Sequence, residues 1–429
     1  MAVKVANLNE RQRYLKHMES WANYLVAQVK PNGFISASAA YYPYTPHWIR
    51  DASFISIGLL DYASFAKSRG MSYEDARNAA HRINKFHCEA IEKHMGSISK
   101  ALDLALEDPE FFKLKNHIPA RVGQDGDYYR DNMMDDNYQK EVRSGLIQHD
   151  TIPLAIHALY KEHRAFGLDE SQKEFLNKNM RTLLNYLGKI YFTECANMWE
   201  METTVIHSYD VGVIHSAFQI AKALSDEGII EIGRSEIEGI ETGLFDGGPK
   251  EFLKRFFIDN GVIYREKWMF QNNPDKLKSV DIAELYLFTM FGINDRTLGI
   301  DGVESSTIKE IDKVLFASNA LPIRHLGDEY FSGGRWINVG AEFSIYLARK
   351  GETQRAKRII DYVVDKYGEH LPEQEIVDPA SPHVVDYYYV NNGYKVIDDL
   401  AWSYAAMLSA TSVLLESMEK HADKSVLRG

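Results

Sequence analysis

The chain has 429 residues, of which 45% are hydrophobic and 12% aromatic, so it is long enough to bury a large core. The formal net charge is −12 and no basic stripe occurs, which argues against nucleic acids and anionic membranes as partners. The only two cysteines, Cys88 and Cys195, exclude a disulfide framework and have no metal-ligand spacing. We therefore expect two buried thiols, no metal and no cofactor.

The N-terminal sequence lacks the apolar run of a secretion signal, and no apolar stretch approaches the ~20 residues that a membrane-spanning helix needs. These two observations predict a cytoplasmic protein that does not cross a membrane. The oligomeric state stays open.

Apolar residues recur at helical spacing along most of the chain. Asp51 is a good N-cap for one of these helices, Thr307 caps another, and Pro153 is allowed in a first turn that leads to a helix end at Gly167. The predicted helices cover about 8–29, 51–70, 72–91, 150–167, 175–187, 214–224, 249–256, 276–291, 307 onward, 336–350, 352–368 and 399–418.

Long polar and aromatic loops alternate with shorter ones between these helices. The long loops fall at about 31–50, 107–148, 194–206, 321–335 and 370–398. Short connections imply antiparallel neighbours, and no Gly-, Ser- or Pro-rich linker divides the chain. The pattern favours one all-α toroidal domain over residues 1–429, with two concentric rings of helices and the long loops gathered at one mouth.

One of these loops places acids beside a tryptophan. It contains Trp199 and Glu200, with Glu194 and Glu202 close by. An indole face packs well against the C–H groups of a sugar, and its bulk can dry a neighbouring carboxyl so that it holds a proton near neutral pH. The alternative is a set of solvated loop acids and a core tryptophan.

Six short blocks, in order along residues 30–415, resemble glycoside hydrolase family 15, the glucoamylase-like inverting enzymes with an (α/α)6 barrel. Each block alone is a weak signal, but their order and the helices between them are specific. The blocks are Trp48-Ile49-Arg50-Asp51, Gln148-His149-Asp150, Trp199-Glu200, Arg324 to Tyr330, Leu371-Pro372-Glu373-Gln374 and Trp402-Ser403-Tyr404-Ala405.

The resemblance implies a role for each candidate site residue. Glu200 would be the general acid and Glu373 the general base of an inverting hydrolysis. Arg50 and Asp51 would clamp the hydroxyls of the first sugar, although Asp51 as an N-cap in a surface ion pair is the plainer alternative. Substrate contacts are also implied for Trp48, Trp199, Arg324 and Trp336, each of which could instead be a core or structural residue.

Three positions depart from the family pattern. Met201 stands where many members have a second glutamate that contacts the leaving sugar, Met198 replaces a leucine, and Tyr404 replaces a histidine. The acid and the base remain in place, but the leaving-group subsite is altered. We therefore include Met201 among the substrate-binding candidates and expect a short substrate.

The sequence thus predicts an exo-acting inverting glycosidase that releases β-D-glucose from short α-glucosides, with α-1,6 links favoured over α-1,4. A glucoamylase acting on maltooligosaccharides, a trehalase, a sugar epimerase and an unsaturated-uronide hydrolase are the alternatives among enzymes. A non-catalytic carbohydrate-binding or regulatory relative is the alternative from another class, and the presence of both Glu200 and Glu373 argues against it.

Overall fold

The structure, a computed structural model, describes residues 2–38, 44–104, 120–127, 148–200, 205–243, 245–266, 279–317, 319–328, 330–375 and 396–426. Helices dominate these ranges, and the strands in them are two residues long. The predicted all-α class is confirmed.

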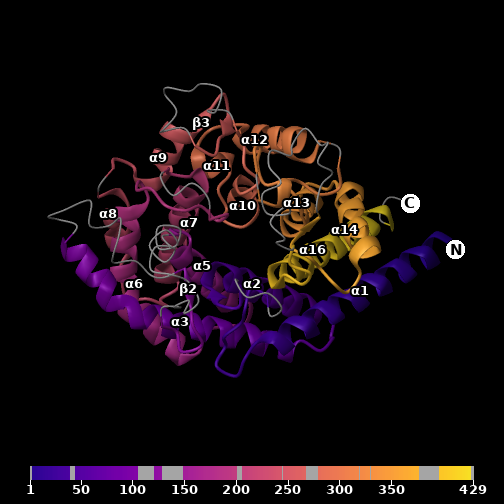
Figure 1. Cartoon of the computed structure of the whole chain (residues 1–429), viewed down its shortest axis with the longest axis horizontal. Helices are drawn as coiled ribbons and strands as arrows, with labels where there is room; N and C mark the ends of the chain where they lie inside the picture. The colour runs from indigo at the N-terminus through magenta and orange to yellow at the C-terminus, as the bar shows by residue number, and fades with distance from the viewer. Residues whose placement is uncertain are drawn as a thin grey trace. The chain divides into compact units, whose positions relative to one another are not determined.

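The helices of the described residues follow one another along most of the chain (Figure 1). They are α1 (Ala2–Gln28), α2 (Ile49–Lys67), α3 (Glu74–Leu104), α5 (Thr151–Phe166), α6 (Glu170–Ile190), α7 (Ser208–Asp226), α8 (Arg234–Thr242), α9 (Gly248–Phe257), α10 (Glu284–Thr289), α11 (Asp295–Leu298), α12 (Val303–Ile311), α13 (Ile337–Arg349), α14 (Thr353–Tyr367) and α16 (Ala401–Val426).

Short strands pair antiparallel beside three of the loops. The pairs are β1 (His47–Trp48) with β2 (Arg121–Val122), β3 (Ile258–Asp259) with β4 (Val262–Ile263), and β5 (Arg335–Trp336) with β6 (Gln374–Glu375). Gly334 makes the last pairing possible, because a Cβ atom there would lie 1.8 Å from the Gln374 side chain. Two of these pairs therefore include residues of the sequence blocks: β1 contains Trp48, and β6 contains Gln374.

Two predicted helix caps are wrong. Helix α2 begins at Ile49, whose N–H donates to the Ala120 carbonyl (2.9 Å), so Asp51 lies in the first turn and accepts hydrogen bonds from Arg50. Thr307 lies inside α12, where its hydroxyl accepts the N–H of Ile263 and ties the helix to β4. Thr307 is therefore bonded to a residue far along the chain, whereas the Asp51 side chain is bonded to its own neighbour Arg50, and neither acts as a helix cap.

Other local predictions are confirmed. Pro153 lies in the first turn of α5, and Gly167 ends that helix with a positive φ of 84°. Helices α13 and α14 match the predicted ranges to within a few residues. Cys88 and Cys195 are buried free thiols. Within the predicted helix 276–291, the described part is helical only over α10.

The contacts divide the chain into two compact units. Unit 1 contains residues 1–45, 54–82 and 312–429, and unit 2 contains residues 46–53 and 83–311. The chain passes from one unit to the other four times, twice inside a helix. The prediction of one domain over residues 1–429 stays a prediction.

In unit 1, α13 packs against both α14 and α16, and α1 packs against α16. Helix α1 is tied to α14 by Tyr14, which donates to Asp361 (2.7 Å), and by Trp21, which donates to the Gly368 carbonyl (3.0 Å). A Cβ atom on Gly58 would lie 2.5 Å from the Ala405 carbonyl oxygen, so this glycine lets α2 approach α16 closely. These helices carry the loop of residues 371–375 at one end.

In unit 2, α7 is the central helix and contacts α5, α8, α9 and α10 (Figure 1). All of its residues from Ser208 to Phe218 are buried, which matches its low content of charged residues. Two of its buried polar side chains share one partner: Glu241 of α8 accepts from His215 (2.8 Å) and from Lys222 (2.6 Å). The start of α7 leads directly from the loop that contains Trp199 and Glu200.

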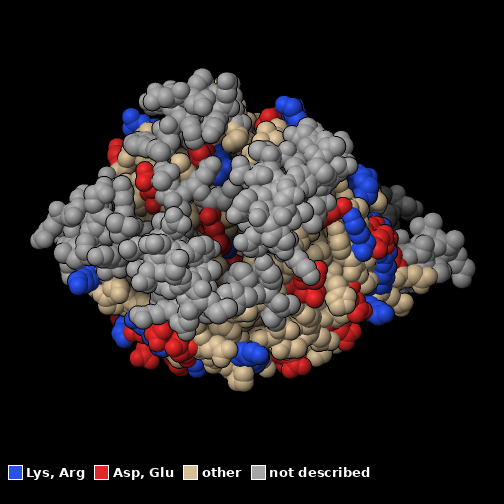
Figure 2. Space-filling model, in the orientation of Figure 1, with Lys and Arg blue, Asp and Glu red and all other residues tan. Residues whose placement is uncertain are grey.

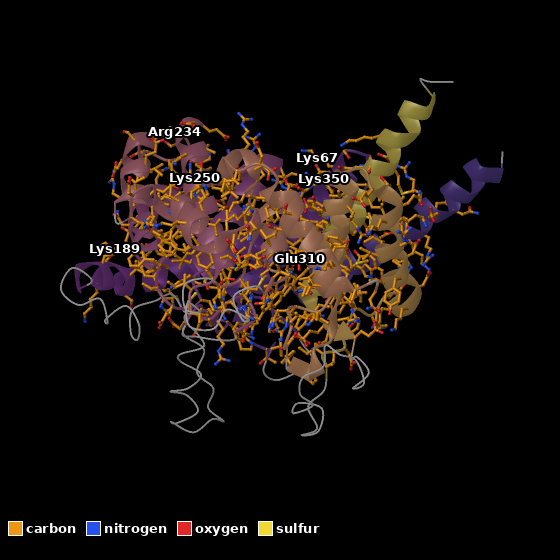
Figure 3. The ribbon with its side chains drawn as sticks, turned by 90° about the horizontal axis from the view of Figure 1, so that it is seen from above. Lys67, Lys189, Arg234, Lys250, Glu310 and Lys350 are labelled. Carbon is orange, nitrogen blue, oxygen red and sulfur yellow. The ribbon has the colours of Figure 1, made fainter. Side chains whose placement is uncertain are left out.

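Charged side chains of both signs share the surface. In Figure 2, Lys and Arg side chains lie interspersed with Asp and Glu side chains on the described part of this face. Arg234, at the start of α8, lies at the periphery in Figure 3 and forms ion pairs with Asp226 and Glu238. Among the described residues, none of the helices combines the length and the hydropathy needed to cross a bilayer.

Candidate active site

The first candidate cluster lies in unit 2, where β1 passes into α2. Trp48 pairs with Arg121 across the strands, and the Arg121 guanidinium carbon lies 5.3 Å from the centre of the Trp48 ring. Arg50 and Asp51 follow in the first turn of α2, and each is 5% exposed. The strand pair thus fixes the direction in which this turn presents its two charged side chains.

Arg50 holds three other side chains of unit 2. Its guanidinium donates to Asp51 (3.1 and 3.2 Å), to the Gln148 side-chain oxygen (3.0 Å) and to Glu200 (2.8 Å). These hydrogen bonds to carboxylates are charge-assisted and therefore strong. Three of the sequence blocks, although far apart along the chain, meet on one guanidinium.

Burial decides the electrostatics of this cluster. Burial disfavours the charged form of Arg50 and so lowers its pKa. The negative charges of Asp51, Glu200 and Asp150 raise the pKa, and their combined effect is the larger one. Burial also raises the pKa of Asp51, and Arg50 offsets part of that rise. Glu200 differs from these residues because 38% of its side chain is exposed. It is thus the member of the cluster that a ligand can reach.

Asp150, which is fully buried, also has a shifted pKa. Burial raises its pKa to about 6, Arg50 opposes the rise, and the charges of Asp51 and Glu200 add to it. In an unfolded chain its pKa is 3.8. The stability that the protonated Asp150 contributes is therefore complete below pH 3.8 and is lost as the pH rises through about 6.

The variant Asp150→Asn should consequently be more stable than the parent protein at pH 8, by up to roughly 3 kcal/mol, and equal to it near pH 4. Urea unfolding at several pH values measures this difference. Asp226→Asn, on the surface of α7, should show no such pH dependence. An Asp150→Asn variant less stable than the parent at pH 8 would mean that the cluster needs this carboxylate charged.

The loop before Glu200 is tightly bonded. The Asn197 side-chain oxygen accepts the N–H of Trp199 (2.9 Å), and the Asn197 carbonyl accepts the N–H of Glu200 (2.9 Å). The Trp199 indole N–H donates to Asp281 (2.8 Å). Glu200 itself has a φ of 62°, in the left-handed region that non-glycine residues rarely occupy. Strain of this kind persists where the surrounding contacts impose it.

The second candidate cluster lies in unit 1 around Glu373, which is 2% exposed. Two tyrosine hydroxyls contact its carboxylate: Tyr44 donates to one oxygen (3.1 Å) and Tyr330 to the other (3.3 Å). The two hydroxyls also lie 2.6 Å apart. Each hydroxyl has a single proton for these three contacts, but both carboxylate oxygens lie within hydrogen-bonding distance of a tyrosine, a setting that restricts the orientation of the group.

Residues around the start of α16 hold the backbone of the Glu373 loop. The N–H of Glu373 donates to the Ile397 carbonyl (2.9 Å), and the Ser403 hydroxyl donates to the Pro372 carbonyl (2.9 Å). The Tyr404 hydroxyl accepts the N–H of Leu371 (3.2 Å) and contacts Asp399. Tyr404 therefore holds the backbone of this loop at Leu371.

Arg324 has an aromatic setting in the same unit. It forms two hydrogen bonds to Asp328 (2.6 and 2.7 Å), and its guanidinium carbon lies 4.7 Å from the Trp336 ring centre and 5.0 Å from the Tyr330 ring centre. Trp336 pairs with Gln374, the residue after Glu373. Arg324 and Trp336 therefore belong to the surroundings of Glu373, and Arg324 is also a member of a buried ion pair.

The predicted site residues thus fall into two groups. Unit 2 contains Trp48, Arg50, Asp51, Trp199 and Glu200, and unit 1 contains Arg324, Trp336 and Glu373. Met201 lies outside the described residues. That Glu200 and Glu373 face one another stays a prediction.

Sequence reasoning missed the hydroxyl of Tyr44 and the aspartate at 281 as site neighbours. The tyrosine-rich run before Trp48 was a signal for the first, whereas nothing local pointed to Asp281. Among the described residues, no group of three or more His, Cys, Asp or Glu side chains is arranged to hold a metal ion.

No family model matches the chain, and no curated protein is similar to it in sequence. Solved structures are similar in fold. A glycosidase superposes with a TM-score of 0.75 at 18% identity, covering 95% of this chain and 98% of its own. The glucoamylase of Saccharomycopsis fibuligera superposes with a TM-score of 0.59 at 13% identity, covering 95% and 96%. The Hormoconis resinae glucoamylase gives 0.56 at 13% identity, covering 95% and 74%.

The fold is an (α/α)6 barrel. The predicted barrel class is therefore confirmed, and at these identities the likeness concerns the fold alone.

Proposed function

We propose that this chain is an exo-acting inverting glycoside hydrolase that releases β-D-glucose from the non-reducing end of short α-glucosides, with α-1,6 links favoured over α-1,4. The supporting observation is that Arg50 binds both Asp51 and the partly exposed Glu200. The fold likeness adds to it, because one variant of the similar glycosidase is described in complex with glucose and a similar bacterial glucoamylase in complex with acarbose.

In this proposal Glu200 donates its proton to the glycosidic oxygen as the bond to the anomeric carbon breaks. Glu373 accepts a proton from a water molecule that attacks that carbon from the opposite face. An inverting pair needs a separation of about 6.5–9.5 Å to admit the water. The two tyrosine hydroxyls on Glu373 orient the carboxylate that would take this proton.

Arg50 has a second part in this scheme. Hydroxyls of the terminal sugar can accept hydrogen bonds from the Arg50 guanidinium, which in the free protein donates to Glu200.

The preference for a short α-1,6 substrate rests on Met201. A thioether cannot accept useful hydrogen bonds from a leaving sugar, but it provides an adaptable apolar wall. An α-1,6 link adds a rotatable methylene that such a wall tolerates, and the missing carboxylate contact weakens recognition of α-1,4 links. The expected order of kcat/KM is isomaltose first, then maltose, then maltoheptaose.

Incubation with isomaltose, maltose, maltoheptaose and trehalose, with glucose release followed over time, tests the proposal. Specificity is the ratio of the kcat/KM values. Proton NMR recorded before mutarotation should show β-glucose as the first product. Release of α-glucose first would contradict inversion. Maltoheptaose as the best substrate would replace the short-substrate proposal with glucoamylase activity, and trehalose with trehalase activity. No release from any of the four sugars would contradict the hydrolase.

The variant Tyr44→Phe should lower kcat by about 10–100-fold, because it removes a hydrogen bond to a charged carboxylate that must be oriented for proton transfer. KM should change little. Tyr362→Phe is the matched control, since Tyr362 donates to Glu375 (2.7 Å), which has no role in the proposal. Equal losses in the two variants would argue that the tyrosines only stabilise the unit.

A further inference from the structure

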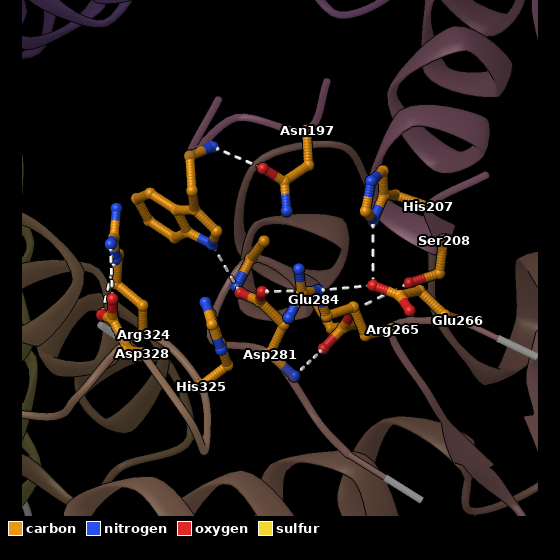
Figure 4. A network of polar contacts seen from close by, with 12 residues as sticks. Asn197, His207, Ser208, Arg265, Glu266, Asp281, Glu284, Arg324, His325 and Asp328 are labelled. Carbon is orange, nitrogen blue, oxygen red and sulfur yellow. Dashed lines mark hydrogen bonds and ion pairs between the residues drawn. The ribbon is translucent and has the colours of Figure 1, made fainter. Parts of the chain in front are cut away.

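Asp281 is buried in unit 2, far along the chain from every block that the sequence analysis identified, and is 1% exposed. One of its carboxylate oxygens accepts the indole N–H of Trp199 (2.8 Å) and the backbone N–H of Ala283 (2.8 Å) (Figure 4). The other oxygen lies 3.5 Å from Nε of Arg265. A single buried carboxylate thus connects the turn before α10 to the loop of the candidate general acid.

The surroundings of Asp281 hold it in place. Its backbone N–H donates to Glu284 (2.6 Å), whose other oxygen accepts the hydroxyl of Ser208 (2.8 Å) at the start of α7. Burial and the neighbouring charge of Asp281 raise the pKa of Glu284 well above its usual value. The ion pair between Arg265 and Glu266 (3.0 Å) and the nearby His207 complete the network (Figure 4).

Packing alone does not account for the contact with Trp199. The Trp48 indole, equally buried at 7% exposed, has no hydrogen-bond partner for its N–H among the described residues. Within the part of the chain that the structure describes, an indole of the same burial in the same unit thus stands without an acceptor. At Trp199 the chain instead supplies a carboxylate, and a hydrogen bond to a charged acceptor is roughly twice as strong as one to a neutral group.

The residue after Trp199 is strained. Glu200 has a φ of 62°, in the left-handed region that is unfavourable for a residue with a side chain. The strain persists because the side chains on both sides of the Trp199–Glu200 peptide bond are held. Asp281 binds the Trp199 ring, and Arg50 binds the Glu200 carboxyl group. Release of the ring would let the backbone relax to a negative φ and would move the carboxyl group.

We propose that Asp281 is a positioning residue that holds the Glu200 carboxyl in its reactive orientation by fixing the indole of Trp199. The proposal rests on the proposed function for its kinetic consequence and on geometry alone for its structural one. Asp281 contacts neither the substrate nor the reacting atoms. Its effect is on the efficiency with which Glu200 delivers a proton.

The kinetic test compares substrates that differ in their need for an acid. A disaccharide requires protonation of its leaving oxygen, whereas fluoride leaves from α-glucosyl fluoride without a general acid. Asp281→Leu, which keeps the size of the side chain but has no acceptor, should lose about 10–100-fold in kcat on the best disaccharide. Its kcat on α-glucosyl fluoride should stay within about twofold of the parent, and Asp281→Asn should recover most of the loss because it keeps an acceptor oxygen.

Asp295→Asn is the matched control. Asp295 also lies in unit 2 and accepts two backbone N–H groups, from Gly302 and Glu304 (both 2.8 Å), without contact to a tryptophan. Its replacement should leave the ratio of the two kcat values unchanged. An equal loss on both substrates in Asp281→Leu would overturn the proposal, because a general defect of the fold does not distinguish leaving groups.

The structural test needs no activity. Nitrogen-15 labelled tryptophan gives one indole N–H signal per residue, and the Trp199→Phe variant assigns the signal of Trp199. In Asp281→Leu this signal should shift and its hydrogen exchange should accelerate, while the other indole signals stay in place. An unchanged Trp199 signal overturns the positioning role. A changed signal in a protein that hydrolyses no α-glucoside would refute the proposed function and the catalytic consequence, but leave the structural link intact.

Discussion

Replacement of Glu200 by glutamine should lower kcat on the best disaccharide by about 10²–10⁴-fold, the usual contribution of a general acid. Glutamine keeps the size of the side chain and can still accept a hydrogen bond from Arg50, so the protein should fold normally. On α-glucosyl fluoride the variant should retain most of its activity, because the leaving fluoride needs no proton. Initial rates on both substrates measure the effect.

Glu373→Gln supplies the comparison. Loss of a general base slows attack by water whatever the leaving group is, so this variant should fail on both substrates. Glu375→Gln, two residues along the same loop, should resemble the parent protein. If Glu200→Gln lost equal activity on both substrates, or if Glu373→Gln retained activity on the fluoride alone, the assignment of acid and base would have to be exchanged.

Replacement of Arg50 by methionine should destabilise the protein by roughly 3–5 kcal/mol at pH 7, the cost of removing one partner from a buried ion pair. The carboxyl groups of Asp51 and Asp150 would lose their buried cation. The free energy of unfolding from urea titration measures this cost. Protonation of these groups relieves it, so the difference from the parent protein should shrink as the pH falls towards 5.

Arg234→Met is the matched control for this variant. Arg234 also has two carboxylate partners, but its side chain is 53% exposed, and a surface ion pair contributes about 0–1 kcal/mol. Equal destabilisation of the two variants would mean that the Arg50 cluster is effectively solvated. Because Arg50 is also proposed to hold the terminal sugar, its loss should raise KM for every α-glucoside tested.

The sequence predicted the helical class and most helix ranges because apolar periodicity reports directly on burial of one helix face. The ends of the helices were harder to predict from the sequence. At Asp51 the local pattern indicated a cap, but the helix begins two residues earlier, where Ala120, the residue before β2, supplies a backbone acceptor from a distant part of the chain. A cap competes with tertiary partners, and a local pattern contains no information about those partners.

The candidate site shows the same division. Residues in short blocks, such as Arg50 and Glu200, could be selected from chemistry and from a family resemblance, and the structure brings these two together. Asp281 could not be selected, because it stands in no block that suggests chemistry, and for Tyr44 the sequence offered only the tyrosine-rich run before Trp48. Their importance comes from which atoms they touch, and those contacts join residues 82 and 329 positions apart.

The interleaving of the two units along the chain has a consequence for the newly made protein. Unit 1 draws on both the first 45 residues and those after position 311, and its contacts between α1 and α14 span 347 positions. During synthesis α1 therefore stays without its partners until all of unit 2 has been made, because α14 and α16 follow unit 2 in the sequence. Contacts between residues so far apart in the sequence form slowly, and until they form the apolar surface is exposed and prone to aggregation. From this order of synthesis we expect α1 to be a segment of the new chain that a chaperone protects.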